Sequence, residues 1–195
     1  VCVFYPTDGV SRVQKLAMQT QAGDNVRAVG ITGNFDDAQT AVKTAFRDDR
    51  LKTALGENNI TMSSANSINI GRLVPQIAYY YSTYCDLVDA GEIKAGDKID
   101  FIVPTGNFGN ILAGWYALKM GLPINKLVCA SNRNNVLTDF IKTGEYDVNR
   151  EFYKTESPSM DILISSNLER LIYETSGRDA TKTAERYAEL KATGR

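Results

Sequence analysis

Histidine is absent from all 195 residues of this chain. Its absence excludes Ser-His-Asp and Cys-His catalysis, zinc sites that use imidazole ligands, and acid–base chemistry by imidazole. We therefore expect no metal site. Any chemistry must rest on backbone groups, hydroxyls, carboxylates, lysines or a bound cofactor.

Cysteines and long apolar runs are scarce as well. Cys2, Cys85 and Cys129 stand far apart among apolar or aromatic neighbours. This pattern predicts buried, reduced thiols rather than nucleophiles or metal ligands. No stretch approaches the roughly 18 continuous apolar residues of a membrane span, and the first residues lack the basic region and cleavage site of a signal peptide. The sequence thus predicts a cytoplasmic protein that does not enter a membrane.

An excess of either charge is also missing. The 22 Lys and Arg residues nearly balance the 23 Asp and Glu residues, for a formal charge of -1. This balance argues against nucleic acid or an anionic membrane as the main partner. With 43% apolar and 23% charged residues, the composition is that of a globular protein with a buried core.

The patterns that are present follow the rhythm of a parallel α/β fold. Runs of β-favouring residues at 1–5 and 26–31 are each followed by helical spacing, at 11–20 and after Asn34. Further along, the spacing predicts strands at 99–103 and 127–130 and an irregular stretch at 146–164, with helices at 110–120, from 136, at 167–173 and at 181–190.

A polar, turn-prone stretch at 58–70 separates these two halves. Its composition predicts a crossing between two domains, over residues 1–60 and 61–195. A long helix with apolar residues at three- and four-residue steps follows, and Pro75 fits that helix only within its first turn.

The most informative stretch is the loop after the strand at 99–103. Gly106 and Gly109 stand three residues apart there, and no acidic residue occupies the first turn of the following helix. Glycine lets the backbone approach an anion closely, and unpaired N–H groups at a helix N-terminus attract phosphate. The loop is neither a Walker A motif nor a Rossmann fingerprint. These residues alone leave open both an anion site and a plain strand–helix turn.

The chain repeats the same four residue types, Thr-Gly-Asn-Phe, at 32–35 and at 105–108. In the first copy Asp36 and Asp37 follow, and these two acids suit the positive end of a helix and repel phosphate. Residue chemistry therefore predicts an ordinary cap at 32–35 and an anion loop at 105–110.

The sequence Pro-Thr-Gly-Asn-Phe-Gly-Asn at 104–110 resembles the phosphate-binding loop of the threonine synthase family, pyridoxal-phosphate (PLP) enzymes of fold type II (tryptophan synthase β-like). Four further segments are similar to family counterparts in the same order, at 3–6, 33–38, 63–73 and 158–162. The resemblance covers nearly the whole chain. It implies parallel sheets flanked by helices, with 1–60 as the remainder of a smaller α/β domain and 61–195 as most of a larger PLP-binding domain.

The resemblance also implies a chemistry. The family is a group of PLP-dependent carbon–oxygen lyases that convert O-phospho-L-homoserine and water to L-threonine and phosphate by β,γ-replacement. It implies that the cofactor phosphate is held chiefly by the backbone N–H groups of Gly106, Asn107, Phe108, Gly109 and Asn110, with the Thr105 hydroxyl as a further donor. Candidates for the substrate side are Asn66, Ser67 and Asn69, against the alternative that they make only local turn and cap hydrogen bonds.

Two family segments do not occur here. These are the Ser-Phe-Lys-Asp-like segment, whose lysine forms the Schiff base with the cofactor, and the Thr-Ser-Gly-Asp-Thr-like loop after it. Both would precede Val1, and the contacts to the pyridine nitrogen would follow Arg195. The chain also opens without methionine, inside an expected strand. We therefore expect an internal fragment that has no catalytic residue and is inactive by itself; whether it retains PLP stays open.

Two other functions stay open at this point. One is a non-catalytic phosphate-binding or regulatory relative that never carried the lysine, and the other is a fold-type-II PLP eliminase that acts on a different amino acid. The expected partner is a small-molecule substrate rather than a nucleic acid or a membrane. The oligomeric state does not follow from the sequence.

Overall fold

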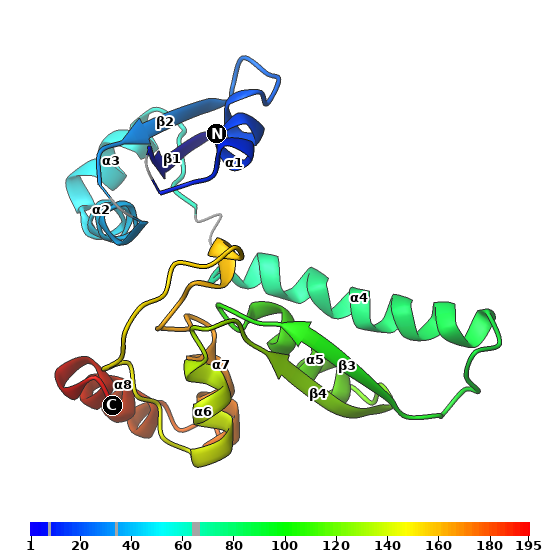
Figure 1. Ribbon diagram of the computed structural model, residues 1–195. Helices are drawn as coiled ribbons and strands as arrows, with labels where there is room; N and C mark the ends of the chain where they lie inside the picture. The colour runs from blue at the N-terminus through cyan, green and yellow to red at the C-terminus, as the bar shows by residue number, and fades with distance from the viewer. Residues whose placement is uncertain (8, 34, 64–66) are drawn as a thin grey trace. The chain divides into compact units, whose positions relative to one another are not determined.

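The computed structural model describes residues 1–7, 9–33, 35–63 and 67–195 (Figure 1). The chain divides into two compact units, Val1–Ser63 and Ser64–Arg195. Each unit contains a two-stranded parallel sheet with helices packed against it. The predicted α/β class is confirmed, and the assignment of residues 1–60 and 61–195 to two enzyme domains stays a prediction.

The first unit is built around the parallel pairing of its two strands, with Phe4 opposite Val29. Its first helix starts where the sequence predicts. The Ser11 side chain accepts a hydrogen bond from the backbone N–H of Gln14, and the Gln14 side chain accepts one from the backbone N–H of Ser11. The elements of this unit are β1 (Cys2–Pro6), α1 (Arg12–Gln19), β2 (Arg27–Ile31), α2 (Phe35–Arg47) and α3 (Asp49–Glu57).

Helix α3 is absent from the sequence-based expectation. It buries none of its residues, and its apolar residues Leu51, Ala54 and Leu55 form only a short stripe. A cap starts it instead, because the Asp48 carboxylate accepts hydrogen bonds from the backbone N–H groups of Arg50 and Leu51. The cap predicted at Asn34 lies outside the described residues.

The second unit pairs its two strands in parallel, with Val103 opposite Cys129. The stretch predicted to be irregular, 146–164, contains only the 3₁₀ turn η1 (Pro158–Met160). The other elements of this unit are α4 (Ile70–Asp89), β3 (Ile99–Pro104), α5 (Gly109–Lys119), β4 (Ile124–Ala130), α6 (Val136–Thr143), α7 (Leu168–Thr175) and α8 (Ala180–Thr193).

The core of the second unit centres on α5, where Leu112 is fully buried. Helix α4 packs along α5 and contacts β3, because the ring of Tyr80 meets Phe101 edge to face with centroids 4.8 Å apart. One long tyrosine-rich helix thus links the sheet to the start and body of α5 (Figure 1).

Pro75 lies in the interior of α4, so the prediction that it falls in the first turn is wrong. The helix begins early because the Asn69 side chain accepts a hydrogen bond from the backbone N–H of Gly71, 2.9 Å away. Proline has no N–H, so the carbonyl of Gly71, four residues before it, loses its usual helical donor.

The prediction of buried thiols is wrong for Cys2 and Cys85, which are both exposed, and all three cysteines are free. Both side chains lie on faces of β1 and α4 that the described residues leave uncovered. Cys129 is half-buried, and this burial raises the pKa of its thiol despite hydrogen bonds with Thr105 and Ser131. A thiol with a raised pKa is a poor nucleophile.

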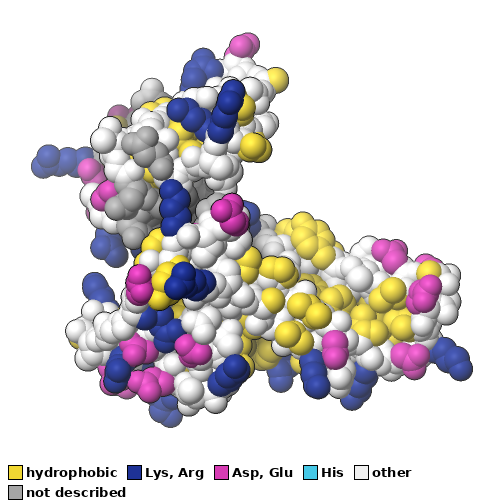
Figure 2. Space-filling view, in the orientation of Figure 1, with side chains coloured by type: hydrophobic (Ala, Val, Ile, Leu, Met, Phe, Trp, Pro, Cys, Tyr) yellow, Lys and Arg dark blue, Asp and Glu magenta, His cyan; other side chains and the backbone are white. Residues whose placement is uncertain are grey.

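Hydrophobic side chains gather on one visible face of the second unit, over the part of the molecule labelled α4, β3 and β4 (Figure 2). Exposed apolar residues of these elements include Val74 and Tyr79 on α4, Ile102 on β3 and Val128 on β4. Among the described residues, no helix combines the length and the apolar character needed to cross a membrane.

Candidate functional site

The predicted anion loop connects the end of β3 to the start of α5, so it lies at the carboxyl end of a parallel strand. Phe108 precedes α5 in the left-handed region, with φ 63° and ψ 6°, and its side chain is buried. A bulky residue in this region costs of the order of 1 to 3 kcal/mol, and such outliers cluster at functional sites. The first turn of α5 contains no acidic residue.

The backbone N–H groups of this loop have no hydrogen-bond partner in the part of the chain that the structure describes. Among the described residues, no atom accepts a hydrogen bond from the N–H groups of residues 106–111. Three of these groups belong to the first turn of α5, where the helix dipole adds positive potential. The loop therefore presents a row of donors suited to an anion.

The carbonyl groups of the same loop are held by the segment before α7. Ser165 donates its hydroxyl to the Gly106 oxygen. The Asn107 oxygen accepts two hydrogen bonds from Asn167, from the backbone N–H at 3.1 Å and from Nδ2 at 3.0 Å. In a trans peptide the C=O and the following N–H point in opposite directions. Tying back these two carbonyls directs the N–H groups of Asn107 and Phe108 away from residues 165–167.

Gly106 leaves little room for a side chain. A Cβ built on Gly106 lies 3.1 Å from the Ser159 carbonyl oxygen and 3.2 Å from both Met160 Cα and Ile162 Cδ1. On Gly109 a Cβ would make ordinary contacts, 3.4 Å from Asn167 Nδ2. The first glycine is thus required by the wall formed by residues 159–162.

That wall is anchored by Asp161. Its Oδ1 accepts hydrogen bonds from Asn132 at 2.8 Å, Asn134 at 3.0 Å and the Thr155 hydroxyl at 2.7 Å, and its Oδ2 accepts one from the Thr155 N–H at 2.8 Å. Partial burial on its own raises the pKa of Asp161, but these donors together outweigh it and hold the pKa below its ordinary value. The carboxylate therefore stays ionised and ties the segment after β4 to the wall over Gly106.

The side chains of the loop divide between structural contacts and one open donor. The Thr105 hydroxyl is buried and donates to the Val103 oxygen at 2.7 Å, so a contact between this hydroxyl and a phosphate stays a prediction. Asn110 is engaged through both polar atoms of its side chain, with Tyr80 and Gln76. Asn107 Oδ1 accepts from the Ser166 hydroxyl at 3.2 Å, while Asn107 Nδ2 donates to no described residue.

Comparison with known proteins places this loop in context. No protein-family model matches the chain. The chain is 48% identical over 194 residues to threonine synthase-like 1 of Homo sapiens, covering 98% of this chain and 26% of that protein. It is 42% identical over 173 residues to threonine synthase of Saccharomyces cerevisiae, covering 89% of this chain and 32% of the enzyme.

Solved structures agree with the sequence relatives. The PLP-bound threonine synthase from Brucella melitensis superposes with a TM-score of 0.85 at 41% identity, over 99% of this chain and 39% of that one. The yeast enzyme gives a TM-score of 0.79 over 100% of this chain and 38% of that one. Over nearly its whole length, this chain is similar to one region of these threonine synthases.

The likeness to threonine synthases extends through both units, yet the chain spans only 26% to 39% of the length of these relatives. The resemblance noted from the sequence is thereby confirmed. These comparisons do not assign individual site residues.

Two of the three residues predicted for the substrate side, Ser67 and Asn69, lie at the start of α4. Ser67 lies beside the loop, because its Cβ is 3.9 Å from a Cβ built on Gly109, and its carbonyl accepts a hydrogen bond from Asn167. Asn69 is the N-cap of α4, and its side chain makes a local cap hydrogen bond, which is the alternative to a substrate contact. Asn66 lies outside the described residues.

The other Thr-Gly-Asn-Phe copy differs in structure as it does in sequence. A Cβ on Gly33 would lie 2.7 Å from Asp37 Oδ2, so a carboxylate already occupies the space beside that glycine. A phosphate at the end of β2 would be repelled by this negative charge. The described part of the first copy is therefore unsuited to the phosphate of a threonine synthase cofactor.

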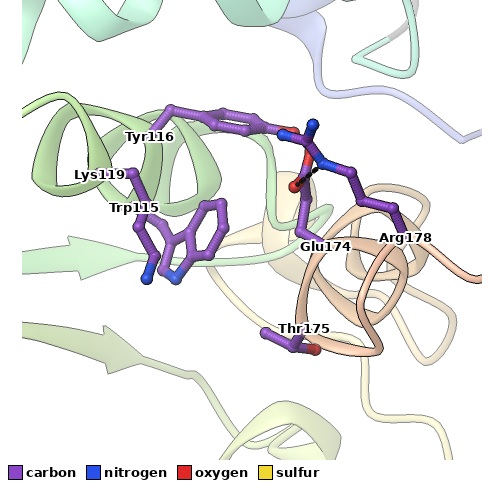
Figure 3. Close-up of a pocket in the computed structure, with 6 residues that line it drawn as sticks. All are labelled: Trp115, Tyr116, Lys119, Glu174, Thr175 and Arg178. Carbon is purple, nitrogen blue, oxygen red and sulfur yellow. Dashed lines mark hydrogen bonds and ion pairs between the residues drawn. The ribbon is translucent and has the colours of Figure 1, made fainter.

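An open pocket of about 510 Å³ lies at the other end of α5 (Figure 3). The Tyr116 hydroxyl donates to Glu174 Oε1 at 3.3 Å, and Arg178 Nε lies 2.9 Å from Glu174 Oε2. These groups point toward one another and satisfy one another (Figure 3). Because α5 rises about 1.5 Å per residue, the pocket is remote from the loop and is not the site that the likeness to threonine synthases indicates.

Sequence reasoning missed Ser165 and Asn167, which organise the loop. Asn167 is completely buried although it is polar. The available signal was a run of three polar residues, Ser-Ser-Asn, directly before an amphipathic helix. Such a run is also typical of an ordinary helix cap, so the sequence alone does not separate the two roles.

Proposed function

We propose that the protein containing this chain is a threonine synthase, which converts O-phospho-L-homoserine and water to L-threonine and phosphate with PLP as cofactor. The single observation that supports this most is the row of unpaired N–H groups at 106–111, in a chain 41% identical to a PLP-bound threonine synthase. The chain spans only part of the length of its relatives, so the complete activity is the proposal.

The loop fits the phosphate group of PLP on chemical grounds. Its donors converge at a helix N-terminus, no acid occupies the first turn, and glycine at 106 keeps the backbone close to its wall. Within this proposal the N–H groups of Gly106, Asn107, Phe108, Gly109 and Asn110 hold the phosphate oxygens, and Asn107 Nδ2 adds a side-chain donor. When bound, PLP supplies an electron sink for carbanionic chemistry.

The described residues orient the cofactor rather than react with it. None of the residues of the loop is a lysine, and we assign no catalytic residue to this chain. The reactive lysine expected from the resemblance remains a prediction for sequence upstream of Val1. We further infer that residues 1–60 belong to the smaller domain of the enzyme and 61–195 to the larger PLP-binding domain. Asn66, Ser67 and Asn69 stay candidates for the substrate side.

An assay of the protein expressed from its complete gene tests this proposal. We expect release of phosphate and L-threonine from O-phospho-L-homoserine, dependent on added PLP. The Gly106→Asp variant places a carboxylate in the loop and should abolish PLP-dependent activity. Activity that survives in Gly106→Asp, or that needs no PLP, would contradict the proposal.

A second candidate function is a fold-type-II PLP eliminase that acts on a different amino acid. Product analysis separates the two. PLP binding together with turnover of another phosphorylated amino acid supports the eliminase, while PLP binding with no turnover supports a non-catalytic relative.

A further inference from the structure

The side chain of Asn167 forms hydrogen bonds to three segments: the loop, the segment before α4, and helix α7. Its Nδ2 donates to the Asn107 oxygen at 3.0 Å and to the Ser67 oxygen at 3.2 Å. Its Oδ1 accepts from Arg170, which also donates to the Ile68 oxygen. An amide has two N–H donors, and both are used. The side chain is fully buried, so water cannot replace these partners.

The hydrogen bond from Asn167 to the Asn107 oxygen holds the phosphate loop. The carbonyl that Asn167 holds belongs to the same peptide unit as the N–H of Phe108, and the two point in opposite directions. Ser165 does the same for the peptide unit that carries the N–H of Asn107. Without the Nδ2 bond the Asn107 carbonyl keeps only the backbone N–H of Asn167, and without Ser165 the Gly106 carbonyl loses the hydroxyl. Both peptide units then gain freedom to rotate, and their donors are less preorganised for an anion.

The hydrogen bond from Asn167 to the Ser67 oxygen connects it to the segment that enters α4. Asn167 and Arg170 together hold the consecutive carbonyls of Ser67 and Ile68. These two residues lie about 100 positions away in sequence, so the contact is specific to the folded unit. No other side chain among the described residues is shown bonded both to the loop and to this segment.

We propose that Asn167 is a positioning residue that couples the cofactor-phosphate loop to the segment before α4. The inference rests on the proposed function. Through one buried amide, the geometry of the N–H donors and the geometry of the candidate substrate segment are set together. Ser165 holds only the loop, so the two residues differ in what their loss should disturb.

The test compares PLP with pyridoxal, which lacks the phosphate, as ligands of the cofactor-free protein expressed from its complete gene. The ratio of the two dissociation constants isolates the contribution of the phosphate. Asn167→Ala and Ser165→Ala should each reduce the preference for PLP by roughly tenfold, the usual effect of losing a buried hydrogen bond. Only Asn167→Ala should also raise the KM for O-phospho-L-homoserine.

Thr183→Val is the matched control, because Thr183 is a buried polar residue whose hydroxyl donates only to Asp179, in the cap of its own helix α8. It should change neither quantity. If Asn167→Ala fails to fold, as judged by circular dichroism, Asn167→Ser replaces it in both measurements. The bound phosphate should also show a shifted ³¹P resonance in the Asn167 and Ser165 variants, and an unchanged one in Thr183→Val.

The outcomes separate the inference from the function on which it rests. A wild-type protein with no preference for PLP over pyridoxal overturns the proposed function and the inference with it. A normal wild-type preference that persists in the Asn167 variants overturns the inference alone. A reduced preference with an unchanged KM overturns the coupling and leaves Asn167 as an anchor of the loop.

Discussion

The hydroxyl of Tyr80 lies 2.9 Å from both the backbone oxygen and the side-chain Oδ1 of Asn110. Burial raises the pKa of Tyr80 to about 12, so the phenol stays protonated and available as a donor at neutral pH. Gln76, one turn earlier on α4, accepts from Asn110 Nδ2 at 3.1 Å. Helix α4 thus holds the side chain of Asn110 and leaves its backbone N–H for a ligand.

Tyr80→Phe should weaken PLP binding several-fold, because Asn110 at the start of α5 then keeps only its bond to Gln76 on α4. We expect the free energy of unfolding to fall by about 1 kcal/mol, the usual value of a neutral hydrogen bond. Fluorescence titration with PLP and thermal unfolding measure the two effects.

Tyr84→Phe is the control for this change. Tyr84 lies one turn further along the same helix, is also buried, and bonds through its hydroxyl to the turn at Gly96 and Asp97. We expect a similar loss of stability with unchanged PLP affinity. Equal losses of affinity in both variants would show that the hydroxyl of Tyr80 acts only through general stability.

Gly106→Ala should reduce both stability and PLP affinity. The new methyl group lies within 3.2 Å of backbone atoms of Ser159 and Met160, which must shift, and overpacking of this kind costs about 1 to 3 kcal/mol. Gly56→Ala is the control, because no atom lies within 4 Å of a Cβ there and alanine favours the helix. The control should be neutral or slightly stabilising in thermal unfolding, and a neutral Gly106→Ala would refute the tight approach of residues 159–162.

Asp161 predicts a specific dependence of stability on pH. Its pKa in the folded protein lies below its ordinary value of 3.8, so its contribution is present above pH 3.8 and is lost as the pH falls through the folded pKa. Asp161→Asn, which also turns an acceptor into a donor facing Asn132 and Thr155, should lower the melting temperature at pH 7. The difference from wild type should shrink below pH 3.8. A difference that stays constant with pH would mean that the carboxylate charge contributes nothing.

Amide hydrogen exchange gives a direct view of the loop donors. Exchange of the N–H groups of 106–111 should be fast without ligand, because no described residue accepts from them, and should slow when PLP binds. Pyridoxal should protect them much less. The turn at Thr32 and Gly33 provides the internal control, and equal protection there would argue against a specific phosphate contact at the loop.

The features that the sequence predicted well are those carried by neighbouring residues. The start of the helix near Ser11 and the strand–glycine–helix order around Gly106 depend on residues a few positions apart. Pro75 shows the limit, since its place in the helix interior depends on where the cap at Asn69 starts α4. Local patterns identify an element well but locate its ends less well.

The anchors of the site depend on contacts between distant parts of the chain. Asn167 and Asn107 stand 60 residues apart, and Ser165 and Gly106 stand 59 apart. No periodicity or local motif encodes such a pairing. The exposure of Cys85 has the same origin, because burial depends on what covers a helix face rather than on the residues beside it.

The conformation of Phe108 restricts which residues that position can accept. A left-handed backbone disfavours branching at Cβ, which argues against valine and isoleucine there. Glycine and asparagine suit the backbone but leave the space of a buried ring empty. Variation among natural sequences should therefore be confined here to large, unbranched side chains. The backbone conformation of this one residue thus limits which substitutions the strand–helix junction tolerates.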